Sequence, residues 1–138
     1  MAQADSFYKQ HEELVEVVGK ISGKLNAATI VAQAGEVRGL LNTLLGKLSI
    51  QLSMEDKALY PRLQQHADAK IRDTAKKFAT EMANVAPVVQ AFGAKWSESE
   101  IKANPAAFVE ETKKLFAALA DRIRRENTEL YPLLDKAG

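Results

Sequence analysis

The chain has 138 residues, 46% of them hydrophobic, which is enough for one domain with a genuine core. Its formal net charge is +1, which gives no electrostatic basis for binding nucleic acid or an anionic membrane. Cysteine is absent, so disulfides and thiolate metal sites are excluded. The sequence shows neither a signal peptide nor an apolar run approaching ~18 residues, so we expect a soluble cytoplasmic domain.

Apolar residues recur at steps of three and four in four stretches, a pattern typical of helices packed lengthwise against neighbours. The first stretch runs from Phe7 to Leu25. The second runs from Val37 to Leu59, and Pro61 after it predicts that this helix ends or kinks there.

The third stretch runs from Ile71 to Trp96, and Pro87 within it predicts a bend. The fourth runs from Phe108 to Leu130, with Pro105 at its expected first turn. Because the connections are short, consecutive helices should run antiparallel. The pattern predicts an all-α, up-down-up-down four-helix bundle that occupies residues 1–138 as a single domain.

Polar side chains interrupt these apolar stretches. Burying them without partners would cost several kcal/mol each, so we expect them to pair with one another. In an antiparallel bundle their positions fall at one level, near one end, and Met82 of the third helix faces the same level. The interrupting residues are His11, Gln51, Glu55, Arg122 and Glu126.

One phrase occurs twice at this level: "EDKALYPRL" begins at Glu55 and "ENTELYPLL" begins at Glu126. Both read Glu-x-x-x-Leu-Tyr-Pro-x-Leu. One helical turn before each glutamate stand Gln51 and Arg122. A carboxylate and a second ligand one turn apart on facing helices is how bundles build metal sites, so the repeat indicates such a site or its remnant.

Taken together, these residues resemble the hemerythrin-like (HHE) family, four-helix bundles of about this length that hold two irons in the core. The resemblance covers essentially the whole chain. The family pattern has an early histidine in the first helix, a histidine in the third, and His-x-x-x-Glu followed by Leu-Phe/Tyr-Pro in the second and fourth. Three residues match its ligands: His11 in "KQHEEL", Glu55 in "QLSMEDKALYP" and Glu126 in "RIRRENTELYP".

Three expected histidines are replaced, by Gln51, Met82 and Arg122. A guanidinium has no lone pair to donate to a metal, and an amide or thioether is a weak ligand for iron. We therefore expect Arg122 to hydrogen-bond Glu126 and Glu55, with Gln51 closing the network and Met82 filling the remaining volume.

Such a polar core would replace the metal. The expected protein has lost di-iron and oxygen binding, needs no cofactor and catalyses no reaction. It would act as an interaction or regulatory bundle, with a protein partner or as a homo-oligomer.

The alternative keeps a metal. His11, Glu55 and Glu126 would form a reduced site for one iron or zinc, or a di-iron centre, that binds or senses iron or oxygen. This alternative requires Arg122 to swing away from the centre.

Overall fold

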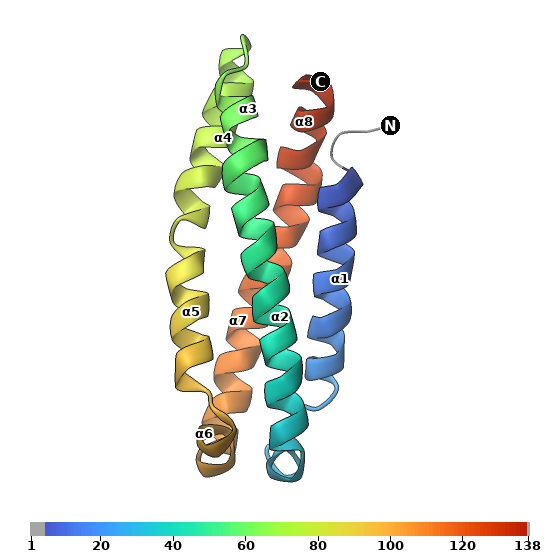
Figure 1. Ribbon diagram of the computed structural model, residues 1–138, viewed down its shortest axis with the longest axis vertical. Helices are drawn as coiled ribbons and strands as arrows, with labels where there is room; N and C mark the ends of the chain where they lie inside the picture. The colour runs from blue at the N-terminus through green and yellow to red at the C-terminus, as the bar shows by residue number, and fades with distance from the viewer. Residues whose placement is uncertain (1–4, 138) are drawn as a thin grey trace.

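The computed structural model describes residues 5–137, except for the side chains of Met82 and of residues 135–137. Within these residues, four helical rods lie side by side and alternate in direction (Figure 1). This arrangement confirms the predicted all-α, up-down-up-down four-helix bundle. The elements of the four rods, in chain order, are α1 (Asp5–Ser22); α2 (Ala34–Met54), the π-helical turn η2 (Glu55–Leu59) and α3 (Tyr60–Gln64); α4 (Ala69–Met82) and α5 (Val85–Lys95); and α7 (Pro105–Arg125), the π-helical turn η3 (Glu126–Leu130) and α8 (Tyr131–Ala137).

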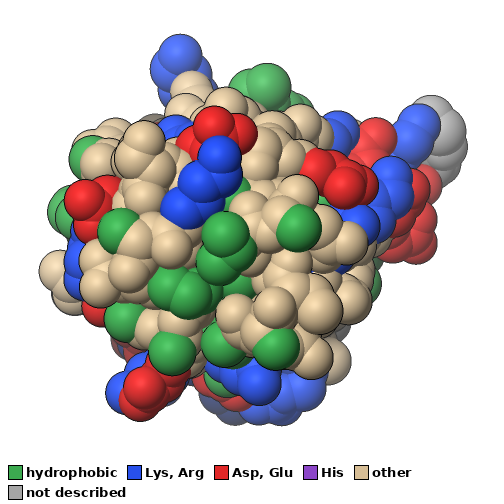
Figure 2. Space-filling view, turned by 90° about the horizontal axis from the view of Figure 1, so that it is seen from below, with side chains coloured by type: hydrophobic (Ala, Val, Ile, Leu, Met, Phe, Trp, Pro, Cys, Tyr) green, Lys and Arg blue, Asp and Glu red, His purple; other side chains and the backbone are tan. Residues whose placement is uncertain are grey.

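The end of the bundle opposite α3 and α8 is closed by the 3-10 turn η1 (Ile30–Gln33) and the short helix α6 (Glu98–Ala103). Trp96 is 1% exposed here and packs edge-on against Phe108, with ring centroids 5.2 Å apart. Figure 2 looks onto this end and shows apolar side chains at its middle, flanked by both acidic and basic groups.

The third rod is broken rather than smoothly bent. Its helix α4 ends at Met82 and α5 begins at Val85. Pro87 therefore lies in the first turn of α5, where a missing backbone N–H costs nothing. The ring of Pro87 would collide with a helical carbonyl four residues earlier, which places the break at residues 83–84.

Pro61 does not end the second helix, contrary to one of the two outcomes predicted from it. The rod continues through Pro61 to Gln64 because η2 widens the helix just before the proline. Pro132 is passed in the same way by η3. A proline cannot donate to the carbonyl four residues earlier, and a π turn shifts the hydrogen bonding by one residue.

The apolar core consists of two clusters with a polar layer between them. One cluster includes Leu14, Leu48 and Leu119, and the other includes Phe7, Leu59 and Leu130, so each rod that carries a polar intruder contributes on both sides of it. The polar layer thus lies inside the bundle, farther from its end than expected. Among residues 5–137 we find no helix with the length and hydrophobicity that a membrane crossing requires.

Candidate metal centre

Two π-helical turns bring the repeated motif into the core. Glu55 opens η2 and Glu126 opens η3, and in each case the carbonyl accepts a hydrogen bond from the backbone N–H of the tyrosine five residues later. A π turn holds an extra residue, so positions five apart fall on the same side of the rod. Each motif therefore buries both its carboxylate and its phenol: Glu55, Tyr60, Glu126 and Tyr131 are 0–4% exposed.

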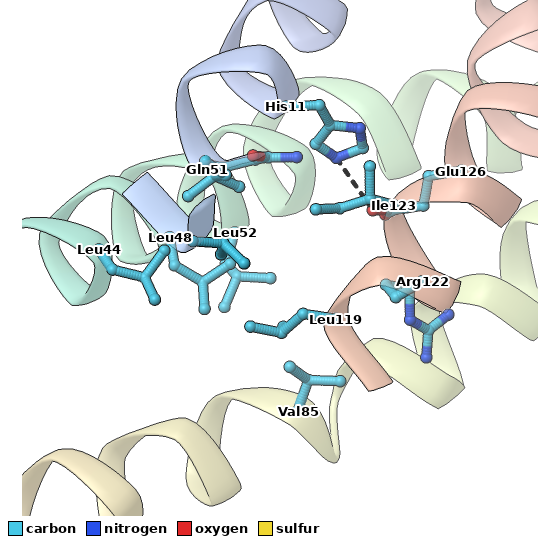
Figure 3. Close-up of a pocket in the computed structure, with 12 residues that line it drawn as sticks. His11, Leu44, Leu48, Gln51, Leu52, Val85, Leu119, Arg122, Ile123 and Glu126 are labelled. Atoms are coloured by element: carbon cyan, nitrogen blue, oxygen red, sulfur yellow. Dashed lines mark ion pairs between the residues drawn. The ribbon is translucent and has the colours of Figure 1, made fainter. Parts of the chain in front are cut away.

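His11 of α1 meets both glutamates. One ligand atom from each of His11, Glu55 and Glu126 lies within 4.8 Å of the other two, and all three residues are buried. The Nε2 atom of His11 is 3.2 Å from Oε1 of Glu126, the contact drawn dashed in Figure 3. The structure thus brings together the three residues that the sequence indicated as remaining ligands.

The ring of His11 is oriented by Asn127. Its Nδ1 lies 2.7 Å from the side-chain oxygen of Asn127, and in the tautomer that donates a proton to this oxygen, Nε2 turns its lone pair toward the glutamates. Burial lowers the pKa of His11, although the Asn127 bond and the charge of Glu55 act in the opposite direction. The imidazole is therefore neutral near pH 7, in the form and orientation that a metal-ligating histidine requires.

Tyr131 is the group that links the centre together. Its hydroxyl donates to Oε1 of Glu55 at 2.7 Å, accepts from the amide nitrogen of Gln51 at 2.9 Å, and lies 2.8 Å from Nε2 of His11. Its ring stacks at a tilt on the His11 ring, with centroids 4.9 Å apart. One phenol thus touches three of the polar residues that the sequence placed at this level.

The two carboxyl groups lack a positive partner at bonding distance. Within the described part of the chain, Oε2 of Glu55 and Oε2 of Glu126 are buried without a hydrogen bond. Burial raises the pKa of Glu55 to about 8, and the nearby charge of Glu126 adds to the rise. Burial likewise raises the pKa of Glu126 to about 7, against the lowering effect of its hydrogen bond with Glu55. A bound cation would neutralise the two carboxylates in place of the protons that these raised pKa values favour.

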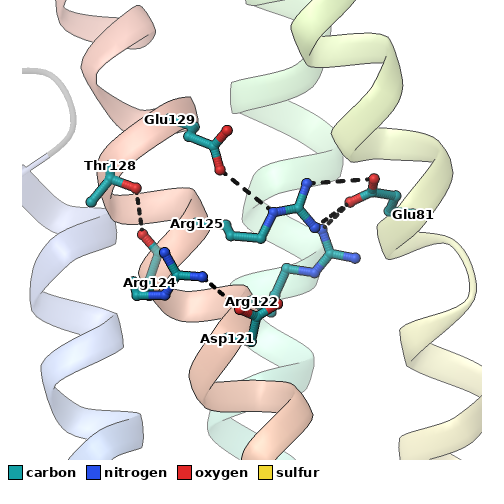
Figure 4. A network of polar contacts seen from close by, with 7 residues as sticks. All are labelled: Glu81, Asp121, Arg122, Arg124, Arg125, Thr128 and Glu129. Atoms are coloured by element: carbon teal, nitrogen blue, oxygen red, sulfur yellow. Dashed lines mark hydrogen bonds and ion pairs between the residues drawn. The ribbon is translucent and has the colours of Figure 1, made fainter.

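Arg122 does not fill that role, and the predicted bonds from Arg122 to Glu126 and Glu55 are wrong. Its Nη1 donates instead to Oε2 of Glu81 on α4, at 3.0 Å (Figure 4). Arg125 donates to the same oxygen at 2.9 Å. The guanidinium groups of Arg122 and Arg125 also lie over the ring of Phe78, which favours this outward position.

Gln51 does join the network, as expected. Its amide nitrogen also lies 3.3 Å from Oε1 of Glu55, and its own oxygen is buried without a partner in the described residues. Beside it is a cavity of about 20 Å³ walled mainly by aliphatic side chains, enough for a molecule the size of water (Figure 3). The side chain of Met82, which was expected to fill the remaining volume, lies outside the described residues.

Sequence reasoning missed three participants: Tyr131, Asn127 and Glu81. Tyr131 stands in the repeated motif, but no role in the centre was predicted for it. Asn127 directly follows Glu126, and its polarity at a helix interior was a usable signal. Glu81 lies beside Met82 and off the apolar stripe, so the helical pattern provided no signal for its role.

The donor set fits a first-row metal ion. One neutral imidazole and two carboxylates are ligands for zinc and iron, and the unpaired oxygens of Glu55 and Glu126 are available for coordination. The phenol oxygen of Tyr131 and the amide oxygen of Gln51 supply further oxygen donors beside them.

Comparison with known proteins agrees with this geometry. Residues 3–134 match the family model described as the hemerythrin HHE cation-binding domain. Neither the curated proteins nor the solved structures include a match to this sequence. Since the family match spans nearly all of a bundle that carries a buried histidine and two buried glutamates, the chain belongs to the hemerythrin family of HHE cation-binding domains.

Proposed function

We propose that this bundle has lost the two-iron centre of its family and binds a single cation, iron or zinc, through His11, Glu55 and Glu126. The observation that carries the proposal is the cluster of these three side chains, which is buried and has two unpaired carboxylate oxygens. A cation in the centre requires Arg122 to point away from it, and the pairing of Arg122 with Glu81 supports this.

The site would hold one cation rather than two because Gln51 and Arg122 stand where the family has histidines. Asn127 would hold the imidazole in its ligating tautomer, and Tyr131 would orient Glu55. Bound iron would supply a redox-active centre suited to iron or oxygen sensing, whereas bound zinc would be structural. We assign no catalytic step to the site.

Metal analysis and titration test the proposal. The purified chain should bind one Zn²⁺ or Fe²⁺, and Glu126→Gln should weaken that binding at least about tenfold by removing one anionic ligand. Glu129→Gln is the matched control: it makes the same change on the same rod, at a side chain that is 55% exposed, and should leave affinity unchanged. Two irons per chain would contradict the single-cation site.

A second candidate function is the metal-free interaction or regulatory bundle. It is favoured by the hydroxyl of Tyr131, which closes the centre through bonds to Glu55 and Gln51 and a contact with His11. It is also favoured by the raised carboxyl pKa values, since protons can occupy the centre near pH 7. A chain that purifies without metal, binds none on titration and melts at the same temperature with chelator would establish this candidate over the first.

A further inference from the structure

Arg122 lies between the buried centre and the surface of the bundle. Its side chain is 13% exposed. It lines the inner cavity together with His11 and Glu126, and it also lines an outer groove of about 290 Å³ between α5 and α7. A rotation about its side-chain bonds could therefore carry the guanidinium from the outer groove to the inner cavity.

The carboxylates of the centre would attract the guanidinium of Arg122. Glu126 stands one turn after Arg122 on the same rod, a spacing at which Arg and Glu side chains meet. Its Oε2 is buried and has no partner in the described part of the chain, and the same holds for Oε2 of Glu55. A guanidinium that reached these oxygens would form charge-assisted hydrogen bonds away from water.

Glu81 provides the competing attraction. It lies on α4, in a different rod from Glu126, and its carboxylate receives Arg122 at 3.0 Å and Arg125 at 2.9 Å (Figure 4). Both arginines hold the pKa of Glu81 below its usual range, mainly through the Arg125 hydrogen bond, so the carboxylate stays charged. Its partners in this structure are the two arginines, and it is not among the residues that line the inner cavity.

We propose that Glu81 is a positioning residue for the cation site: it holds Arg122 outside, and without it the guanidinium would enter the centre and compete with the metal ion. This inference rests on the proposed single-cation function. The guanidinium of Arg122 would then compete with the cation for the two glutamates. Its pairing with Glu81 would set the fraction of molecules in which the site is free.

The experiment uses Zn²⁺ titration of the full chain as the probe. Glu81→Gln keeps the shape of residue 81 and removes its charge, and it should weaken Zn²⁺ binding by about tenfold or more. The double variant Glu81→Gln/Arg122→Met should regain wild-type affinity, because the competitor is gone. A merely structural defect from Glu81→Gln would not be rescued by a second change. Arg124→Met, added to Glu81→Gln in place of Arg122→Met, is the control for loss of a positive charge on α7 and should not restore Zn²⁺ affinity. Arg124 is exposed and pairs with Asp121.

The outcomes separate this inference from the function on which it rests. If the wild-type chain binds no Zn²⁺, the proposed function fails. If the wild type binds and Glu81→Gln binds equally well, the function stands and the inference is overturned. A crystal structure of metal-free Glu81→Gln gives an independent answer: Arg122 hydrogen-bonded to Glu126 supports the inference, and Arg122 still directed outward overturns it.

Discussion

The two tyrosines of the repeated motif should differ sharply in what their hydroxyls contribute. Tyr131→Phe removes a hydroxyl with neighbours at 2.7, 2.8 and 2.9 Å, in a residue that is fully buried. Tyr60→Phe removes a hydroxyl that is also buried but has no hydrogen-bond partner among the described residues. The chemical change, the motif and the position after a π turn are the same.

The magnitudes follow from these contacts. Each lost hydrogen bond costs about 0.5–1.5 kcal/mol net, and a buried group left unsatisfied costs about 1–3 kcal/mol. Glu55 and Gln51 keep their mutual 3.3 Å bond, so the losses are partly offset and we expect about 3 kcal/mol for Tyr131→Phe. Its ring contacts with Phe7 and Tyr8 are unchanged. For Tyr60→Phe we expect no loss, or a gain of up to about 1 kcal/mol.

Urea unfolding of metal-free protein, followed by circular dichroism, measures both values. With an m-value of about 1.5 kcal/mol/M, the midpoint should fall by about 2 M for Tyr131→Phe and should stay the same or rise by up to about 0.7 M for Tyr60→Phe. Equal losses for the two variants would refute the assignment of Tyr131 as the link of the centre.

Two further predictions concern pH and the end of α5. The folded-state pKa values of Glu55 and Glu126, about 8 and about 7, exceed the ordinary 4.5, so the folded protein holds extra protons and its stability must fall as pH rises through this range. The pKa of His11 is lowered, so His11 acts in the opposite sense, but only below its ordinary 6.5. Above pH 6.5, the metal-free protein should lose about 1.4 kcal/mol of stability per pH unit for each extra proton that the folded state holds. A urea-unfolding stability that stays constant up to pH ~8 would contradict this prediction. Arg38→Met should cost about 1–2 kcal/mol of stability, because Arg38 caps the end of α5 by donating to two carbonyls at 2.7 and 2.8 Å. Arg62→Met, at an exposed position, is the control. Equal melting temperatures of the two variants would argue against this capping role.

Helical periodicity was sufficient to predict that three of the polar residues meet at one level, although not how far that level lies from the end of the bundle. His11, Glu55 and Glu126 interrupt apolar stripes, and a residue's height along a rod follows from counting turns, so their convergence could be predicted from the sequence. The four-helix bundle followed from the same periodicity. These features depend on backbone geometry alone.

The direction of Arg122 could not be predicted in this way. An arginine has several rotatable bonds and reaches partners on either side of its helix. Its position one turn from Glu126 predicted an inward bond, while its actual partner, Glu81, lies on a different rod and outside every apolar stripe. Choosing between the two partners requires the three-dimensional arrangement of α4 and α7.

The role of Tyr131 was hidden by the π turn. In a regular α-helix, positions four apart share a face, which would align Leu130 with Glu126. With the wider turn the fifth residue takes that place, and the tyrosine hydroxyl reaches the carboxylate of Glu55.

Each π turn amounts to one residue inserted into an otherwise regular helix, and this has a consequence for how such a centre can change over time. Deleting one residue from Glu55–Leu59 would restore a regular α-helical turn and leave Tyr60 and Leu63 facing the core, because positions four apart share a face of an α-helix. A substitution within the centre changes a single side chain and leaves this register intact. A second deletion in the same segment would rotate everything after it by about 100°, so each glutamate-to-tyrosine segment can lose only its inserted residue.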